Sequence, residues 1–262
     1  MIISSFCLAH IYSMSDFGHT HEFGAVLGAS KGHIKNNKIL VYITTHLSDI
    51  HYKYLDKCWR AMIAKSPLFK QSDFLMFVTE SHGRKANMTL INSVFAETAI
   101  SVHSRKNPGY QEGAILAITE AIENHWFDKY DWVIRVNPDV LIRDDTFLLE
   151  RFGDSRIHGI FVDCLDRDCL AGNHCTNSMI HTDFFAVRPN AISLSAVRET
   201  KQDNAELMIT EVFSSIVKDG ADAWVPGAGP HRGYCRVEGK GSPVIHSHAF
   251  RAMHPACLSW YD

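Results

Sequence analysis

The residues with the clearest chemical potential are Asn137, Pro138 and Asp139, which stand between two apolar stretches. Residues 132–136 form a strand-like run that leads straight into this triplet, and residues 140–142 leave it. The triplet is therefore expected at the carboxyl end of a buried strand, where open α/β sheets bind ligands. A carboxylate there can hold a divalent cation that bridges two phosphates and neutralises a leaving diphosphate. A plain turn is the alternative, because all three residue types favour turns.

The elements that must position this triplet follow a regular pattern in the first half of the chain. Apolar runs rich in strand formers alternate with stretches of helical periodicity. The strands are predicted at 39–43, 74–78, 99–102 and 132–136, and the helices from Ser48 to Ser66 and over 113–127. Such alternation indicates an α/β fold with a central, mostly parallel sheet that helices flank on both faces.

The second half is less regular. Asp144 and Asp145 are predicted to cap a short helix that ends at Gly153. Further strands are predicted at 157–162, 184–187 and 244–248, and a helix over 204–218. We find no linker or repeat, so we predict one domain over residues 38–262, preceded by an extended segment over 1–37.

Composition excludes several classes of protein. The 262 residues are 46% hydrophobic and 21% charged, which suits a chain with a real core. The net charge of −3 gives no reason to expect nucleic acid or an anionic membrane as a partner. No apolar run is long enough to be transmembrane, and the first residues lack the basic start of a signal peptide. We expect a soluble protein, with the cytoplasm and a Golgi or secretory lumen both open.

The seven cysteines do not form a zinc pattern, since no CxxC is present. Cys164, Cys169 and Cys175 cluster in the sequence. A local disulfide such as Cys169–Cys175 is one option if the protein enters a secretory lumen, and free or buried thiols are the other.

The stretch from Tyr130 to Ile142 resembles the segment of GT-A glycosyltransferases that carries their Asp-x-Asp motif. Gly113-Ala114, opening a helix upstream, is also similar to what precedes that motif in several of those families. Asn137 departs from the pattern, because an amide can ligate a metal or bond a ribose hydroxyl but adds no charge. The resemblance implies that Asn137 and Asp139 bind a divalent metal, Mn²⁺ or Mg²⁺, together with the donor.

GT-A enzymes often supply a late histidine to the metal after two apolar residues, and Val244-Ile245-His246 is similar to that pattern. His246 and His248 are two apart and share a face on a strand, so the resemblance implies either as a ligand. Arg251 is implied as a fixed positive charge near the diphosphate. A surface histidine pair on an edge strand is the alternative.

Two further segments supply candidate catalytic carboxylates. The run from His181 to Pro189 looks like the segment that GT-A families place beside the donor sugar, with Asp183 in place of a glycine. Asp183 either binds sugar hydroxyls or is a turn residue. Inverting GT-A enzymes place a base near the start of a helix such as 204–218, where Asp203 and Glu206 stand. That same pair is also a capping-box pattern, with Asp203 as the cap.

The resemblance also implies where the nucleotide binds. Thr44, Thr45 and His46 follow the first predicted strand, where such enzymes hold the base. Arg105 and Lys106 follow the third and can reach phosphate, although solvated charge is the alternative.

We therefore predict a glycosyltransferase that uses a nucleotide-diphosphate sugar donor, a hydroxyl acceptor on a glycan or glycoconjugate, and Mn²⁺ or Mg²⁺. Two alternatives stay open. One is a metal-dependent phosphoester hydrolase that uses Asp139, Asp163, His246 and His248. The other is a catalytically silent module that binds nucleotide sugars.

Overall fold

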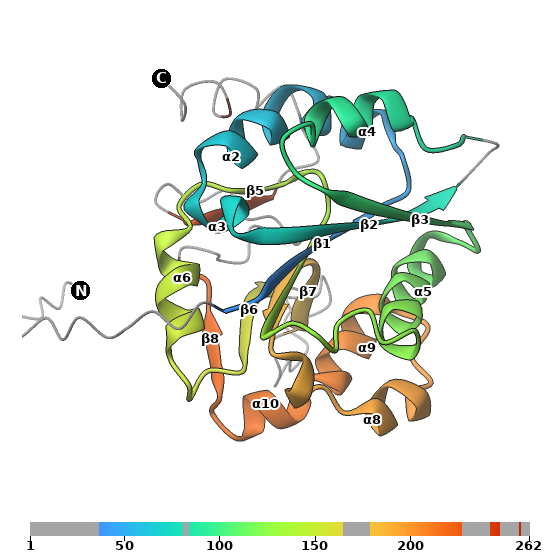
Figure 1. The fold of residues 1–262 in the computed structure, drawn as a ribbon. Helices are drawn as coiled ribbons and strands as arrows, with labels where there is room; N and C mark the ends of the chain where they lie inside the picture. Colours follow the sequence, from blue (N-terminus) through green and yellow to red (C-terminus); the bar gives the residue numbers. More distant parts are fainter. Residues whose placement is uncertain (1–36, 81–83, 165–178, 227–241, 247–256, 258–262) are drawn as a thin grey trace, which may run out of the picture. The chain divides into compact units, whose positions relative to one another are not determined.

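The computed structural model describes residues 37–80, 84–164, 179–226, 242–246 and 257, all within one compact unit. A seven-stranded sheet with the order β3-β2-β1-β4-β7-β6-β8 forms its centre (Figure 1). A separate pair of strands, β5 and β9, completes the strand content of these residues.

The first half of the sheet is parallel, as predicted. Its strands are β1 (Ile39–Thr45), β2 (Ser72–Glu80), β3 (Ile100–Lys106) and β4 (Trp132–Val136). Strand β1 lies in the middle, pairs in parallel with both β2 and β4, and is buried along its whole length. Continuous apolar runs of this kind are typical of parallel strands covered on both faces.

The second half makes the sheet mixed. Strand β7 (Met179–Val187) is antiparallel to both β4 and β6 (Gly159–Cys164), while β8 (Asp222–Trp224) is parallel to β6. The chain fills the sheet from β1 outward through β2 and β3, and then returns to the other side of β1 with β4. The point between β1 and β4 is thus a topological switch point, where open sheets leave a crevice for ligands.

Helices cover both faces of the sheet (Figure 1). Helices of one core cluster are α1 (Asp49–Tyr54), η1 (Leu55–Trp59), α2 (Arg60–Lys65), α3 (Pro67–Lys70), α4 (Met88–Val94) and α6 (Thr146–Gly153). Helices of the other are α5 (Tyr110–Glu123), α8 (Leu194–Glu199), α9 (Ala205–Val212) and α10 (Ser214–Lys218). The short helix η2 (Pro189–Ala191) follows β7.

Alternation along β4 decides which side chains reach which core. Trp132, Ile134 and Val136 belong to the first cluster, and Val133 belongs to the second. Side chains two apart on a strand share a face, so Arg135 falls on the face of Val133, which α5 and α9 cover. A charged residue is thus built into an otherwise apolar layer.

The small sheet brings the end of the described chain to the predicted Asn-Pro-Asp turn. Strand β5 (Val140–Ile142) pairs antiparallel with β9 (Val244–His246), and Val140 lies opposite His246. His246 is therefore placed beside Asp139, the residue that precedes β5.

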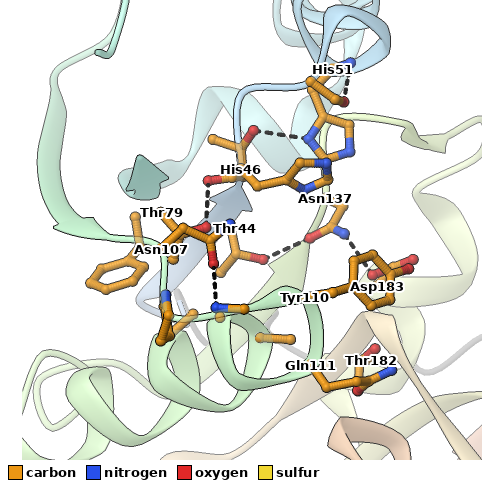
Figure 2. Close-up of a pocket in the computed structure, with 18 of the residues that line it drawn as sticks. Thr44, His46, His51, Thr79, Asn107, Tyr110, Gln111, Asn137, Thr182 and Asp183 are labelled. Atoms are coloured by element: carbon orange, nitrogen blue, oxygen red, sulfur yellow. Dashed lines mark hydrogen bonds between the residues drawn. The ribbon is translucent and has the colours of Figure 1, made fainter. Parts of the chain in front are cut away.

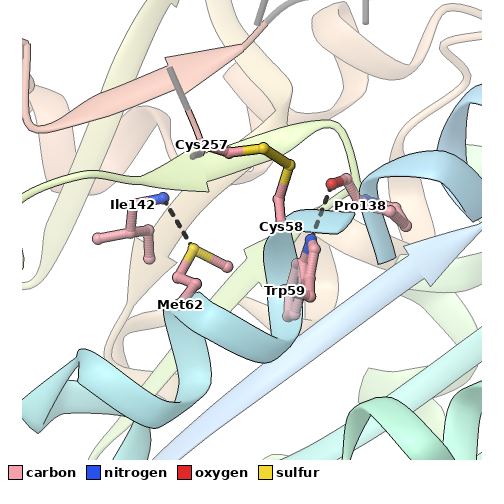
Figure 3. Close-up of a disulfide and its surroundings, with 6 residues drawn as sticks. All are labelled: Cys58, Trp59, Met62, Pro138, Ile142 and Cys257. Carbon is pink, nitrogen blue, oxygen red and sulfur yellow. Dashed lines mark hydrogen bonds between the residues drawn. A yellow bond between two sulfur atoms is a disulfide. The ribbon is translucent and has the colours of Figure 1, made fainter. Parts of the chain in front are cut away.

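A disulfide between Cys58 and Cys257 joins η1 to the chain beyond β9 (Figure 3). Beside it, the indole N–H of Trp59 donates to the carbonyl oxygen of Pro138 at 2.8 Å. The backbone just before Asp139 and the chain beyond β9 are thereby both tied to η1. Cys169 and Cys175, considered as a local disulfide, lie outside the described residues.

Two predicted helices differ from the structure. The helix expected over 204–218 is two helices, α9 and α10, separated by Phe213, whose ring packs against Phe161 and Phe185 in the core. The helix expected at 113–127 runs from Tyr110 to Glu123 instead. It ends early because the Asn124 side chain caps the carbonyl of Glu120, and His125 takes a positive φ.

Candidate functional site

A cavity of about 910 Å³ lies where β1, β2 and β4 end (Figure 2). The start of α5 forms one wall, and Thr182 and Asp183 of β7 with Glu206 of α9 form another. Helix α5 can pack close to the loop before it because Gly113 has no side chain. A Cβ there would lie 2.9 Å from Oδ1 of Asn107.

The three residues predicted to hold the nucleotide all line this cavity: Thr44, Thr45 and His46. Two of them are fixed by neighbours that also line it. The Thr44 hydroxyl donates to Oδ1 of Asn137 at 2.7 Å. The Thr45 hydroxyl lies 2.9 Å from Nδ1 of His51.

Of the other cations predicted to contact the donor, only Arg105 and Lys106 belong to the described residues, and they are placed differently. Arg105 forms a two-pronged ion pair with Glu120 at 3.0 and 3.1 Å, and it is not among the residues that line the cavity. Its neighbour Lys106 does line the cavity. Arg251 and His248 lie outside the described residues.

Asn137 sits between β1 and β7 and bonds to both (Figure 2). Its Oδ1 accepts from Thr44, and its Nδ2 donates to Oδ1 of Asp183 at 2.6 Å. Its backbone carbonyl also accepts from Val140, so the triplet is a turn as well as part of the site. Because both amide atoms already make hydrogen bonds, the geometry favours Asn137 as a residue that positions Asp183.

Two of the predicted carboxylates, those of Asp139 and Asp183, meet at His246. Its Nε2 lies 3.5 Å from Oδ2 of Asp139 and 3.3 Å from Oδ2 of Asp183. Asp139 is fully buried, and its Oδ1 faces Nε2 of His51 at 3.4 Å. His181, Asp183 and His246 offer ligand atoms within 4.8 Å of one another, a group that can hold a metal ion.

Sequence reasoning missed His181 and His51. His181 lies on β7, with Nε2 3.0 Å from Nδ1 of His246 and the two rings nearly perpendicular. Its Nδ1 accepts from the backbone N–H of Asp183. A ring held in this way fixes the orientation of its neighbour, as residues around metal ligands commonly do. The sequence signal for His181 is its position two residues before Asp183, because residues two apart on a strand share a face.

The electrostatics keep Asp183 ionised. Burial alone would raise the pKa of its carboxyl, but the charges of His246, His181 and Arg135 outweigh burial and lower that pKa. Burial lowers the pKa of the Arg135 guanidinium, which Asp183 counters. Asp183 is therefore a charged acceptor at the boundary between the histidines and the cavity.

The capping-box interpretation of Asp203 and Glu206 is wrong. The cap of α9 is Asn204, whose side chain accepts from the N–H of Leu207 at 2.9 Å. Glu206 instead faces the cavity, where it accepts from the hydroxyl of Thr182 at 2.7 Å. Asp203 is exposed and does not line the cavity, so of the two only Glu206 can reach a bound ligand.

No family model matches the chain, and no curated protein matches it in sequence. Several solved structures do match the chain in their fold. A protein from Bacillus anthracis, described as a putative glucose-1-phosphate thymidylyltransferase in complex with a sucrose, has a TM-score of 0.50 at 10% identity and covers 85% of this chain and 96% of its own. The chain has a GT-A-like fold.

Two further solved structures resemble it with lower TM-scores. A galactosyltransferase, LgtC, in complex with donor and acceptor sugar analogs, has a TM-score of 0.49 at 10% identity, over 85% of this chain and 95% of its own. A mannosyltransferase from Pyrobaculum calidifontis, in complex with GDP-Man and Mn²⁺, has a TM-score of 0.44 at 11% identity. This GT-A-like chain covers 59% of that mannosyltransferase, and the match covers 76% of this chain.

The position of the cavity in this GT-A-like fold is the one predicted from the sequence, at the carboxyl ends of the parallel strands. None of the described helices is both long and apolar enough to cross a membrane.

Proposed function

We propose that the chain is a glycosyltransferase that moves a sugar from a nucleotide-diphosphate donor to a hydroxyl of a glycan or glycoconjugate. One observation carries this proposal. Asp139, Asp183 and His246 converge, and Asp183 lines a cavity that also holds the carboxylate of Glu206. The first set can hold a metal and the second can take a proton, which are the two tasks that sugar transfer from a diphosphate requires.

The walls of the cavity suit a nucleotide diphosphate. Thr44, Thr45 and His46 offer hydrogen bonds and a ring at the end of β1. The first turn of α5 opens toward the same space, and its cap, Gly109, has no side chain to satisfy the N–H groups there. Such N–H groups and the helix dipole favour an anion. Lys106 adds a positive charge.

The donor set fits a divalent cation. Carboxylate oxygens suit Mg²⁺ and Mn²⁺ alike, whereas imidazole nitrogen favours the later transition metals. A mixed set of Asp139, Asp183 and His246, with His181 adjacent, therefore favours Mn²⁺ over Mg²⁺. When bound there, the ion would neutralise charge on the diphosphate leaving group.

Glu206 is the candidate general base. Thr182 donates to Oε1, and Nε2 of Gln111 lies 3.4 Å from Oε2, so the carboxylate is held on the wall formed by α5, α9 and β7. A carboxylate fixed in this way can accept the proton of an acceptor hydroxyl as that hydroxyl attacks the anomeric carbon. Direct attack assisted by a base inverts the anomeric centre.

The disulfide supports an oxidising compartment for the protein. Disulfides persist in secretory and extracellular environments and are rare in the cytosol. The Cys58–Cys257 bridge therefore favours the secretory lumen over the cytoplasm among the two compartments left open by the sequence.

The test is donor turnover. The full chain with Mn²⁺ is incubated with UDP-glucose, UDP-galactose and GDP-mannose, each with and without a mixture of glycan acceptors, and released nucleoside diphosphate is measured. We expect acceptor-dependent release with one donor, its loss in Asp139→Asn, and normal rates in Asp203→Asn. Phosphate release from p-nitrophenyl phosphate without nucleotide preference would identify a hydrolase instead. Tight donor binding without release would identify a silent binding module.

A further inference from the structure

Arg135 is a buried cation whose hydrogen-bonding capacity the described chain satisfies only in part. Its side chain is 2% exposed, yet it lines the cavity. Its Nε and Nη1 are buried and make no hydrogen bond to any described residue. Nη1 forms an ion pair with Asp183, in which it lies 3.6 Å from Oδ1. Burying donors without partners is costly, so a ligand that satisfies them would be favoured.

The depth of Arg135 separates it from the level expected for phosphate. It lies two residues before Asn137 on β4, which places it about 6.6 Å further into the sheet along the strand. The residues that can hold a metal lie beyond the end of β4, around Asp139 and His246. Asp183 joins the two levels, because it belongs to the group that can hold a metal and also faces Arg135. A ligand part that passes Asp183 to reach Arg135 therefore lies deeper than a diphosphate held at the metal, where we expect the sugar.

The charges around Arg135 define what that ligand part must be. Asp183 and Glu206 line the same cavity and interact electrostatically with the guanidinium. A guanidinium only donates hydrogen bonds, and an ionised carboxylate only accepts them. A group that meets both must accept and donate at once, which a sugar hydroxyl does. Beside Arg135, a carboxylated sugar would bring a third negative charge to two carboxylates and a single guanidinium.

We propose that Arg135 is the specificity-determining residue for the donor sugar, and that it selects a neutral sugar through its hydroxyls and disfavours uronic acids. This inference rests on the proposed function, because it presupposes a nucleotide-diphosphate sugar in the cavity. It goes beyond that function by naming the class of sugar and the residue that recognises it.

The first test needs no variant. Isothermal titration of the full chain with Mn²⁺ compares UDP, UDP-glucose and UDP-glucuronic acid, and in parallel GDP and GDP-mannose. We expect at least one neutral donor to bind more tightly than its free nucleotide, and UDP-glucuronic acid to bind at least tenfold more weakly than UDP-glucose. Equal or tighter binding of the glucuronic acid donor would overturn the proposal.

The second test uses Arg135→Met and Arg135→Lys, with Arg105→Met as the matched control, since that arginine lies outside the cavity. Both Arg135 variants should bind the free nucleotide within about threefold of the wild type and lose at least tenfold in affinity for the neutral donor. Arg135→Lys keeps the buried charge and carries the test if Arg135→Met does not fold. Equal losses for nucleotide and donor would overturn the proposal while leaving the proposed function intact. No nucleotide binding by the wild type would overturn both.

Discussion

Nε2 of His246 lies 3.5 Å from Oδ2 of Asp139, although Asp139 stands near the middle of the sequence and His246 far beyond it. The pairing of β9 with β5 produces this approach, because it sets His246 opposite Val140. The same nitrogen faces Asp183 at 3.3 Å. Two carboxylates thus converge on one imidazole, an arrangement that gives the site its expected metal dependence.

His246→Gln should weaken Mn²⁺-dependent nucleotide binding by at least about tenfold, since losing a ligand should cost no less than losing a supporting residue. In the presence of EDTA, nucleotide binding by this variant should be close to that of the wild type. The measurement is isothermal titration with UDP and GDP in both conditions.

His103→Gln is the matched control for that change. His103 stacks on Trp126 and does not line the cavity, so its loss should leave both titrations unchanged. Losses in His246→Gln that are equal with and without metal would make His246 a structural residue.

Glu206→Gln separates catalysis from structure. A glutamine can still accept the hydrogen bond from Thr182, so melting temperature and donor affinity should stay near the wild type. It cannot accept the proton of the acceptor hydroxyl, so turnover should fall by about 10²–10⁴-fold. Asp203→Asn should keep its rate because that residue is exposed and outside the cavity. A near-normal rate in Glu206→Gln would remove Glu206 as the base and point to retention of configuration.

Trp59→Phe tests the support of the Asn-Pro-Asp turn. The change removes the buried indole N–H and leaves the carbonyl of Pro138 without its hydrogen bond. This loss should cost about 1–3 kcal/mol in the free energy of unfolding. Urea unfolding measures this cost. Trp126→Phe, which removes an indole from the other face of the sheet, is the control. An equal cost in the two variants would show that the hydrogen bond to Pro138 contributes nothing specific.

The Cys58–Cys257 disulfide should stabilise the fold. Removing it by Cys58→Ser or by a reductant should cost about 2–5 kcal/mol, because the bridge closes a long loop of the unfolded chain. The reductant should have no further effect on Cys58→Ser. A wild-type melting temperature that does not respond to reductant would contradict the bridge and the oxidising compartment inferred from it.

The sequence predicts the parallel half of the fold well, because β1, β2 and β4 are continuous buried runs that carry their own signal. Strand β7 extends well before the predicted start at Phe184 because polar residues such as His181 and Asp183 interrupt its apolar pattern. Those residues are polar because they belong to the site. Local propensity is thus least informative at the strand that carries the ligands.

The site was predictable where it depends on strand ends and not where it depends on long-range pairing. Thr44 and Asn137 follow from their places at strand ends, whereas Asp183 lies inside β7 and was indicated by the resemblance of its segment. The contact between His181 and His246, and the disulfide to Cys257, depend on how β9 docks on β5, which no local pattern specifies. The role of Glu206 is ambiguous from the sequence because Asp203 and Asn204 are both residue types that favour the cap position, and the structure places Asn204 there.

The central claim is that a divalent metal and a nucleotide diphosphate bind together at Asp139, Asp183 and His246. The most direct measurement is Mn²⁺ electron paramagnetic resonance, in which bound ion loses the sharp signal of free Mn²⁺. Adding the full chain with UDP or GDP should remove most of that signal at equimolar protein and metal, and Asp139→Asn should restore it. A signal that the wild-type chain leaves unchanged, or that Asp139→Asn removes equally well, would contradict the claim.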